Sequence, residues 1–118
     1  MGIVISVGKK PEEIWIAQNW VYRWMVGLVE ENYPSEPDIL EELRMAEHIN
    51  GISLELLAKE DIQLSKKISK TVRQVSQGIA SGHYTVPGTD EYHQLISEDS
   101  MKGLFAELVK ILDVTDTW

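Results

Sequence analysis

The chain has 118 residues, no cysteine and a formal net charge of −8, from 19 acidic against 11 basic side chains. Its length suits one helical domain over residues 1–118, and the lack of cysteine excludes disulfides, thiolate metal ligands and a cysteine nucleophile. Because nucleic acid is a polyanion, the acidic balance argues against a protein that coats DNA or RNA. The missing cysteines fit a reducing compartment, and we expect a cytoplasmic location.

The first apolar run, Ile3–Val7, is β-branched apart from Ser6 and is followed by Gly8. It predicts a short strand or an extended arm, which would pair with His83–Val86 or with a second subunit. The run is too short for a signal peptide or a membrane span, so we expect no membrane partner.

A first helix is predicted from about Pro11 to Asn32, because proline suits an opening turn and Tyr33-Pro34 ends it. Within Ile14–Val29 only Arg23 is charged, and apolar residues lie on every side of the predicted helix. A helix that is apolar all round is buried centrally or covered by a partner.

This segment also carries three tryptophans, Trp15, Trp20 and Trp24. Tryptophan is enriched at interfaces, which predicts a homodimer through the Trp-rich first helix. The alternative is that large aromatic side chains in so small a domain belong to its core.

Two further helices are delimited by capping signals. Ser35-Glu36-Pro37-Asp38 opens one, and Asn50-Gly51 ends it. Ser53 opens another that reaches about Ser81, and a break near Asp61 is left open. Apolar residues at helical spacing predict one buried face for it: Leu57, Leu64, Ile68, Val72, Val75 and Ile79.

The remaining segment begins with a turn over Val86–Thr89, followed by a short helix to about Ile96. Ser97 opens a last helix, whose inner face would carry Met101, Leu104, Phe105, Leu108, Ile111 and Leu112. The tail 113–118 is expected to fray. The predicted fold class is therefore all-α, an irregular four- to five-helix bundle to which the N-terminal strand or arm could be added.

The sequence holds no recognisable catalytic or cofactor-binding motif. Phosphate-binding loops, dinucleotide-binding turns, nucleophile elbows and EF-hand patterns are missing, so no cofactor, no metal site and no enzymatic activity are predicted. His83 and His93 bracket the turn-rich loop together with Tyr84 and Tyr92. One alternative is therefore a small metal-dependent or hydrolytic helical enzyme centred on the two histidines. The opposing interpretation is that these side chains hold the loop on the core or face solvent.

A basic cluster offers a second alternative. Five of the eleven basic residues fall between positions 59 and 73. If a helix-turn-helix were present, its second helix would start near Ser65 and present Lys66, Lys67, Lys70 and Arg73 to DNA. The opposing interpretation is one continuous helix with a basic, solvated face.

Charge segregation carries the favoured hypothesis. Residues 30–61 contain ten acidic residues against Arg44 and Lys59. An acidic face of this kind accelerates encounter with a cationic protein. We therefore predict a non-enzymatic protein-binding module, most concretely an acidic immunity- or antitoxin-type inhibitor of a basic toxin. The predicted partner-binding residues are Tyr33, Asp38, Glu41, Glu42 and Glu47. The alternative is that bases on neighbouring helices neutralise these acids locally.

Overall fold

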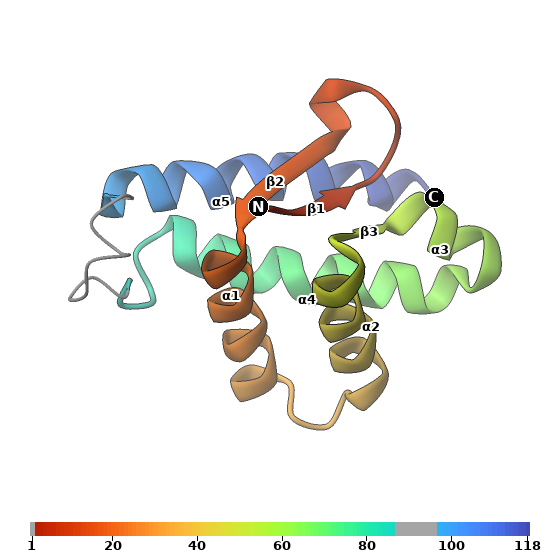
Figure 1. Ribbon diagram of the computed structural model, residues 1–118, viewed down its shortest axis with the longest axis horizontal. Coiled ribbons are helices and arrows are strands. Elements are labelled where there is room, and N and C mark those ends of the chain that lie inside the picture. The colour runs from red at the N-terminus through yellow and green to blue at the C-terminus, as the bar shows by residue number, and fades with distance from the viewer. Residues whose placement is uncertain (1, 87–96) are drawn as a thin grey trace.

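The computed structural model describes residues 2–86 and 97–118. In this part of the chain, five α-helices accompany a three-stranded mixed sheet (Figure 1). The prediction of an all-α bundle is therefore wrong, although most of the described residues are helical. The predicted short helix that ends near Ile96 lies outside the described residues.

The sheet has the order β2-β1-β3. The central strand β1 (Gly2–Ser6) runs antiparallel to β2 (Ile14–Gln18) and parallel to β3 (Gly51–Ser53). Alternate residues of β1 and β2 are buried, as expected for strands with one face on a core. The N-terminal run is thus a strand, but its partners are β2 and β3 and not residues 83–86.

The expected first helix is split into a turn, a strand and a helix. Pro11–Glu13 forms the 3₁₀ turn η1, β2 follows, and helix α1 is Asn19–Asn32. The prediction that Ile14–Gln18 is helical is wrong. In β2, every second residue is buried, namely Trp15 and Ala17. On a helical projection these strand residues fall on other sides than the buried face of α1, which is why the predicted helix looked apolar all round.

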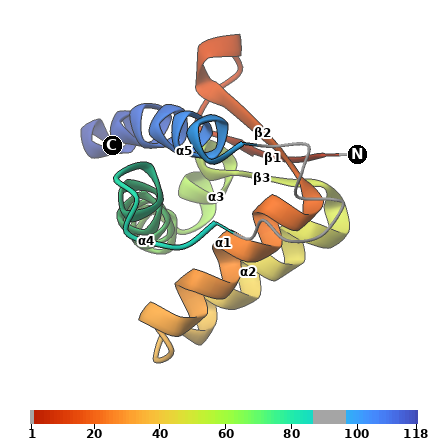
Figure 2. The same ribbon diagram turned by 90° about the vertical axis from the view of Figure 1, so that its left-hand side faces the viewer.

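Helix α1 then buries a single face, made of Val21, Tyr22, Met25, Val26, Leu28 and Val29. It lies beside α2 (Pro37–Ile49), as both ribbon views show (Figures 1 and 2). The buried Tyr22 hydroxyl joins the two helices by donating a hydrogen bond to the Leu43 carbonyl at 2.6 Å. Burial, reinforced by the Glu47 charge, raises the pKa of the Tyr22 phenol.

The capping signals locate the middle helices well. Asn50 ends α2 in the left-handed conformation, with φ of 67°. The Ser53 hydroxyl caps α3 (Leu54–Glu60), and the Asp61 carboxylate caps α4 (Ile62–Ala80). Residues 53–81 are therefore two helices with a break at Asp61. Ser35 does not cap α2, whose N-cap position is Glu36.

Helices α4 and α5 (Glu98–Leu112) lie side by side and form a second layer (Figure 2). Ser97 caps α5 as predicted, by accepting a hydrogen bond from the Ser100 amide at 3.1 Å. Their apolar faces join the core beneath the sheet, where Trp15 donates its indole N–H to the Leu104 carbonyl at 2.9 Å. This bond attaches β2 to α5.

The C-terminal tail does not fray as predicted but forms the 3₁₀ helix η3 (Asp113–Thr117). Arg73 of α4 holds it through hydrogen bonds to Asp113 at 2.9 Å and Asp116 at 2.7 Å. The Thr115 hydroxyl is buried at 2.6 Å from that of Ser69. Across residues 2–86 and 97–118, no helix is both long and apolar enough to cross a membrane.

Candidate protein-binding groove

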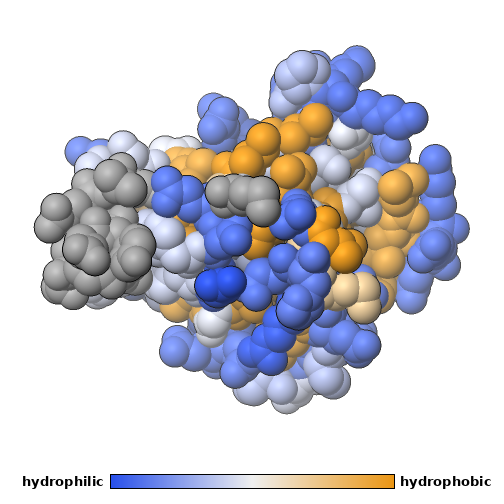
Figure 3. All heavy atoms as spheres, viewed as in Figure 1, coloured by the Kyte–Doolittle hydropathy of each residue, from blue (hydrophilic) through white to orange (hydrophobic). Residues whose placement is uncertain are grey.

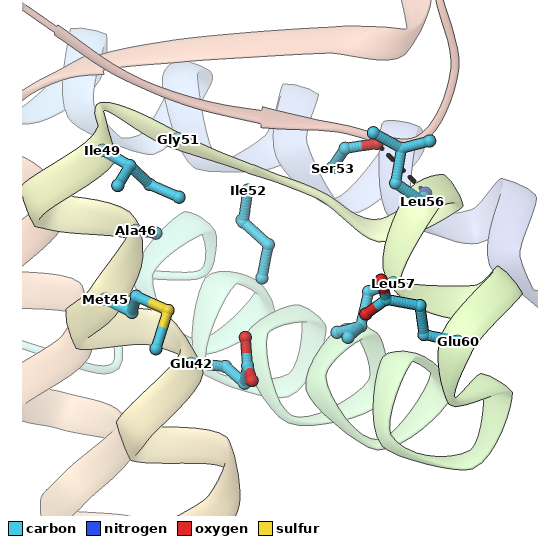
Figure 4. A pocket seen from close by; sticks show the side chains of 10 residues that line it. All are labelled: Glu42, Met45, Ala46, Ile49, Gly51, Ile52, Ser53, Leu56, Leu57 and Glu60. Atoms are coloured by element: carbon cyan, nitrogen blue, oxygen red, sulfur yellow. Dashed lines mark hydrogen bonds between the residues drawn. The ribbon is translucent and has the colours of Figure 1, made fainter.

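A groove opens between α2, β3 and α3, with a volume of about 180 Å³ (Figure 4). Local turns create it, because Asn50 ends α2 and only the three residues of β3 separate Asn50 from the start of α3 at Leu54. Gly51 allows β3 to approach β1 closely, since a Cβ at this position would lie 2.7 Å from the Val4 carbonyl oxygen. The lining residues are Glu42, Met45, Ala46, Ile49, Gly51, Ile52, Ser53, Leu56, Leu57 and Glu60.

Three large apolar side chains of the groove are left outside the core. Met45 is 47% exposed, Leu56 is 58% exposed and Ile49 is 68% exposed. Hydrophobic surface with hydrophilic side chains around it is visible on this face of the molecule (Figure 3). Single exposed apolar residues need no explanation, but several that converge on one hollow are typical of an interaction site.

Two carboxylates lie on opposite walls of the groove. Figure 4 shows Glu42 projecting from α2 and Glu60 from α3. Neither has an ion-pair partner among the residues that the structure describes. The groove therefore combines an apolar floor with two free negative charges.

Only one of the five predicted partner-binding residues, Glu42, lines this groove. Asp38 lies 3.4 Å from Lys67, and Glu47 lies 2.9 Å from Arg23. The Tyr33 hydroxyl donates a hydrogen bond to the Gln74 side chain. Glu41 is exposed on α2 and is not among the lining residues.

Local neutralisation, the alternative considered from the sequence, accounts for much of the acidic stretch. Lys67 also binds Glu36 at 3.1 Å, and these hydrogen bonds raise the pKa of Lys67. Arg44 of α2 forms an ion pair with Glu30 of α1. The surface is thus mixed around α1, α2 and α4, and the groove retains free acids.

Sequence reasoning missed Glu60, Met45, Ile49 and Leu56 as site residues. A signal was present in α2, whose buried stripe is Ile39, Leu43 and Ala46. Met45 and Ile49 are four residues apart and form a second apolar pair beside that stripe. No local pattern could reveal that α3 places Leu56 opposite that pair.

The basic residues predicted for DNA contact are largely occupied within the chain. Lys66 donates to the Trp118 carbonyl at 3.0 Å, Lys67 binds α2 acids, and Arg73 binds η3. Lys70 is exposed. A break between helices exists at Asp61, but α4 starts at Ile62 and not near Ser65. These contacts do not provide the free basic face that DNA binding requires, and this role stays an untested prediction.

The site predicted around His83 and His93 is only partly described, because His93 and Tyr92 lie outside the described residues. His83 packs its ring edge against Tyr84, with ring centres 6.0 Å apart. No group of three histidine, aspartate or glutamate side chains placed to hold a metal ion occurs in residues 2–86 and 97–118.

Comparisons with protein-family models, curated proteins and solved structures found no match for this chain.

Proposed function

We propose that this protein is a non-enzymatic protein-binding module, and that the α2–β3–α3 groove takes an apolar segment of a cationic protein. The supporting observation is that the exposed side chains of Met45, Ile49 and Leu56 line one groove. The carboxylates of Glu42 and Glu60 line it too and have no ion-pair partner in the described part of the chain. Apolar side chains of the partner would fill the floor, and its lysine or arginine side chains would reach the two walls.

The size of the groove favours a protein segment over a small molecule. Pockets for small ligands usually enclose roughly 300–1,000 Å³, and about 180 Å³ is below that range. Covering the exposed apolar side chains provides affinity at about 25 cal/mol per Å² removed from water. The carboxylates and the net charge of −8 provide orientation and a faster encounter with a cation.

An inhibitor of a basic toxin is the most concrete protein of this kind. Its mechanism would be occlusion, with the bound segment belonging to the active site or substrate-binding surface of the toxin. The immunity- or antitoxin-type role stays a prediction within the broader proposal of protein binding.

The direct test uses a fluorescein-labelled amphipathic helical peptide built from leucine and lysine, with fluorescence anisotropy as the readout. Binding to the wild-type protein should weaken as salt is added. Ile49→Ser should weaken it about tenfold, the equivalent of about 1.4 kcal/mol, through loss of apolar contact. Because Ile49 is 68% exposed, this variant should fold normally.

The matched control separates the groove from net charge alone. Glu42→Lys and Glu107→Lys change the charge equally, but Glu107 is an exposed residue of α5 outside the groove. Glu42→Lys should weaken peptide binding about tenfold, and Glu107→Lys by no more than about twofold. Equal losses in both variants, or full binding by Ile49→Ser, would overturn the proposal.

A further inference from the structure

The two edges of the sheet differ in how open they are. The outer strand β3 has three residues. Only Asn50 separates it from the end of α2, and α3 follows it directly. The other outer strand, β2, has five residues and lies beyond β1 (Figure 1). A strand edge is a template for pairing with another chain, and short edges bounded by other elements are the usual protection. β2 is longer than β3, and no strand of the described part of the chain lies on its outer side.

Hydrogen bonding shows which groups of β2 face outward. The Val7 amide donates to the Glu13 carbonyl at 2.9 Å, which makes this a hydrogen-bonded pair of the antiparallel ladder. Such pairs alternate with non-bonded ones, so Ile5 pairs with Trp15 through hydrogen bonds, and Ile16 does not bond its opposite residue. The amide and carbonyl of Ile16 therefore point away from β1.

The opposite residue of Ile16 confirms this assignment. Val4 donates its amide to the Asn50 carbonyl at 3.1 Å, on the β3 side. No hydrogen-bond partner for the Ile16 amide or carbonyl occurs in the described part of the chain. Its side chain is also 60% exposed, although it lies at the middle of the strand.

The chemistry of β2 favours a second copy of this chain as the occupant. A chain of net charge −8 can associate with itself only where acids do not meet. The segment Ile14–Gln18 has no charged residue, and neither does its neighbour Gly2–Ser6. It also lacks the lysine or proline with which edge strands often prevent pairing.

We propose that two copies pair antiparallel along β2, with Ile16 of one copy opposite Ile16 of the other. This register has two-fold symmetry. Ile14 and Gln18 are equally distant from Ile16, so Ile14 of each copy lies opposite Gln18 of the other. The Ile16 amides and carbonyls satisfy one another, and the Gln18 amide reaches the Ile14 carbonyl of the second copy. The two sheets become one continuous sheet, and the two Ile16 side chains cover each other.

The interface differs from the homodimer predicted through the Trp-rich first helix. Trp15 lies in β2 and is buried toward α5, while Trp20 and Trp24 pack partly buried against the core. The outward-facing backbone of Ile16, which has no partner among the described residues, and not the tryptophans, specifies the contact. The two copies also meet away from the α2–β3–α3 groove, so this proposal is independent of the proposed function.

Sedimentation equilibrium over a wide range of protein concentration tests the proposal. The wild-type chain should form dimers that tighten with salt, because salt screens the repulsion between two acidic copies. Ile16→Lys should weaken the dimer by more than about tenfold, since two lysines then oppose each other. Val114→Lys is the matched control on η3, at a side chain that is 38% exposed, and should dimerise like the wild type.

Two further measurements separate loss of pairing from loss of folding. A mixture of Ile16→Lys and Ile16→Glu chains should recover the dimer, because lysine then faces glutamate. Hydrogen exchange of the wild-type Ile16 amide should slow as the protein concentration rises. A wild-type chain that stays monomeric throughout, or equal dimerisation by Ile16→Lys and Val114→Lys, would overturn the proposal.

Discussion

At the scale of single residues, two buried serines of α4 show that the same side chain can stabilise or destabilise the fold, depending on its hydrogen bonds. Ser65 and Ser76 are both fully buried. The Ser65 hydroxyl donates to the Leu54 carbonyl at 2.7 Å and so joins α4 to α3. Among the residues that the structure describes, the Ser76 hydroxyl has no hydrogen-bond partner. Their removal should therefore have different consequences.

We expect Ser65→Ala to lower the free energy of unfolding by about 0.5–1.5 kcal/mol, because it removes the buried hydrogen bond that joins α4 to the Leu54 carbonyl of α3. Ser76→Ala should leave the stability unchanged or raise it slightly, since it removes a hydroxyl that was buried without a partner. Urea unfolding followed by circular dichroism measures both. Equal losses at the two positions would contradict this view of the α4 interior.

At the scale of the elements, two glycines differ in whether close packing requires them. A Cβ at Gly27, inside α1, would meet no atom of the described residues within 4 Å beyond its chain neighbours and the backbone of its own helix. A Cβ at Gly51, on β3, would collide with the backbone of β1. Gly27 therefore weakens its helix without a steric reason, whereas Gly51 is required where β3 and β1 meet.

Gly27→Ala should raise the free energy of unfolding by about 0.5–1 kcal/mol, because alanine loses less backbone entropy in a helix. Gly51→Ala is the comparison and should destabilise the protein, because its Cβ would lie 2.7 Å from the Val4 carbonyl oxygen. Thermal and urea unfolding should agree on both signs. A loss of stability in Gly27→Ala would indicate that α1 has a neighbour at this position in the native protein.

At the scale of the whole molecule, ion pairs connect elements that are distant in sequence. Arg23 of α1 reaches Glu47 of α2, and Arg73 of α4 binds Asp113 and Asp116 of η3. The Arg73 guanidinium holds the pKa of Asp116 below its ordinary value of 3.8. A carboxylate whose pKa is lowered on folding stabilises the native state above its unfolded pKa, and this contribution disappears as the pH falls.

The contact between Arg73 and η3 should therefore weaken in acid. The contribution of Asp116 is fully present at neutral pH and fades as the pH falls below about 4, when the carboxylate takes up a proton. Asp116→Asn removes this titration, so its unfolding free energy should fall less steeply below pH 4 than that of the wild type. At pH 7 the variant should be slightly less stable. Parallel pH profiles for the two chains would show that Asp116 does not stabilise the tail in this way.

Local signals predicted most helix boundaries correctly. Asn50, Ser53 and Ser97 act on backbone groups within a few residues, so their roles can be recognised from adjacent sequence. The prediction over Ile14–Gln18 was wrong because a short, nearly continuous apolar run suits a strand as well as a helix. Its conformation was decided by β1, which supplies the hydrogen bonds of the ladder.

The amino-acid sequence by itself determined the acidity of this chain, its lack of recognisable catalytic motifs, its main helix caps and the apolar faces of its last two helices. These properties depend on composition or on neighbours along the chain. Only the tertiary structure decided that α2 and α3 face each other. It also decided that Asp38 and Glu47 have ion-pair partners, whereas Glu42 and Glu60 have none among the described residues. The physical reason is that a charge is neutralised, or an apolar side chain covered, by whatever lies within a few ångströms in space, and that depends on how distant segments pack.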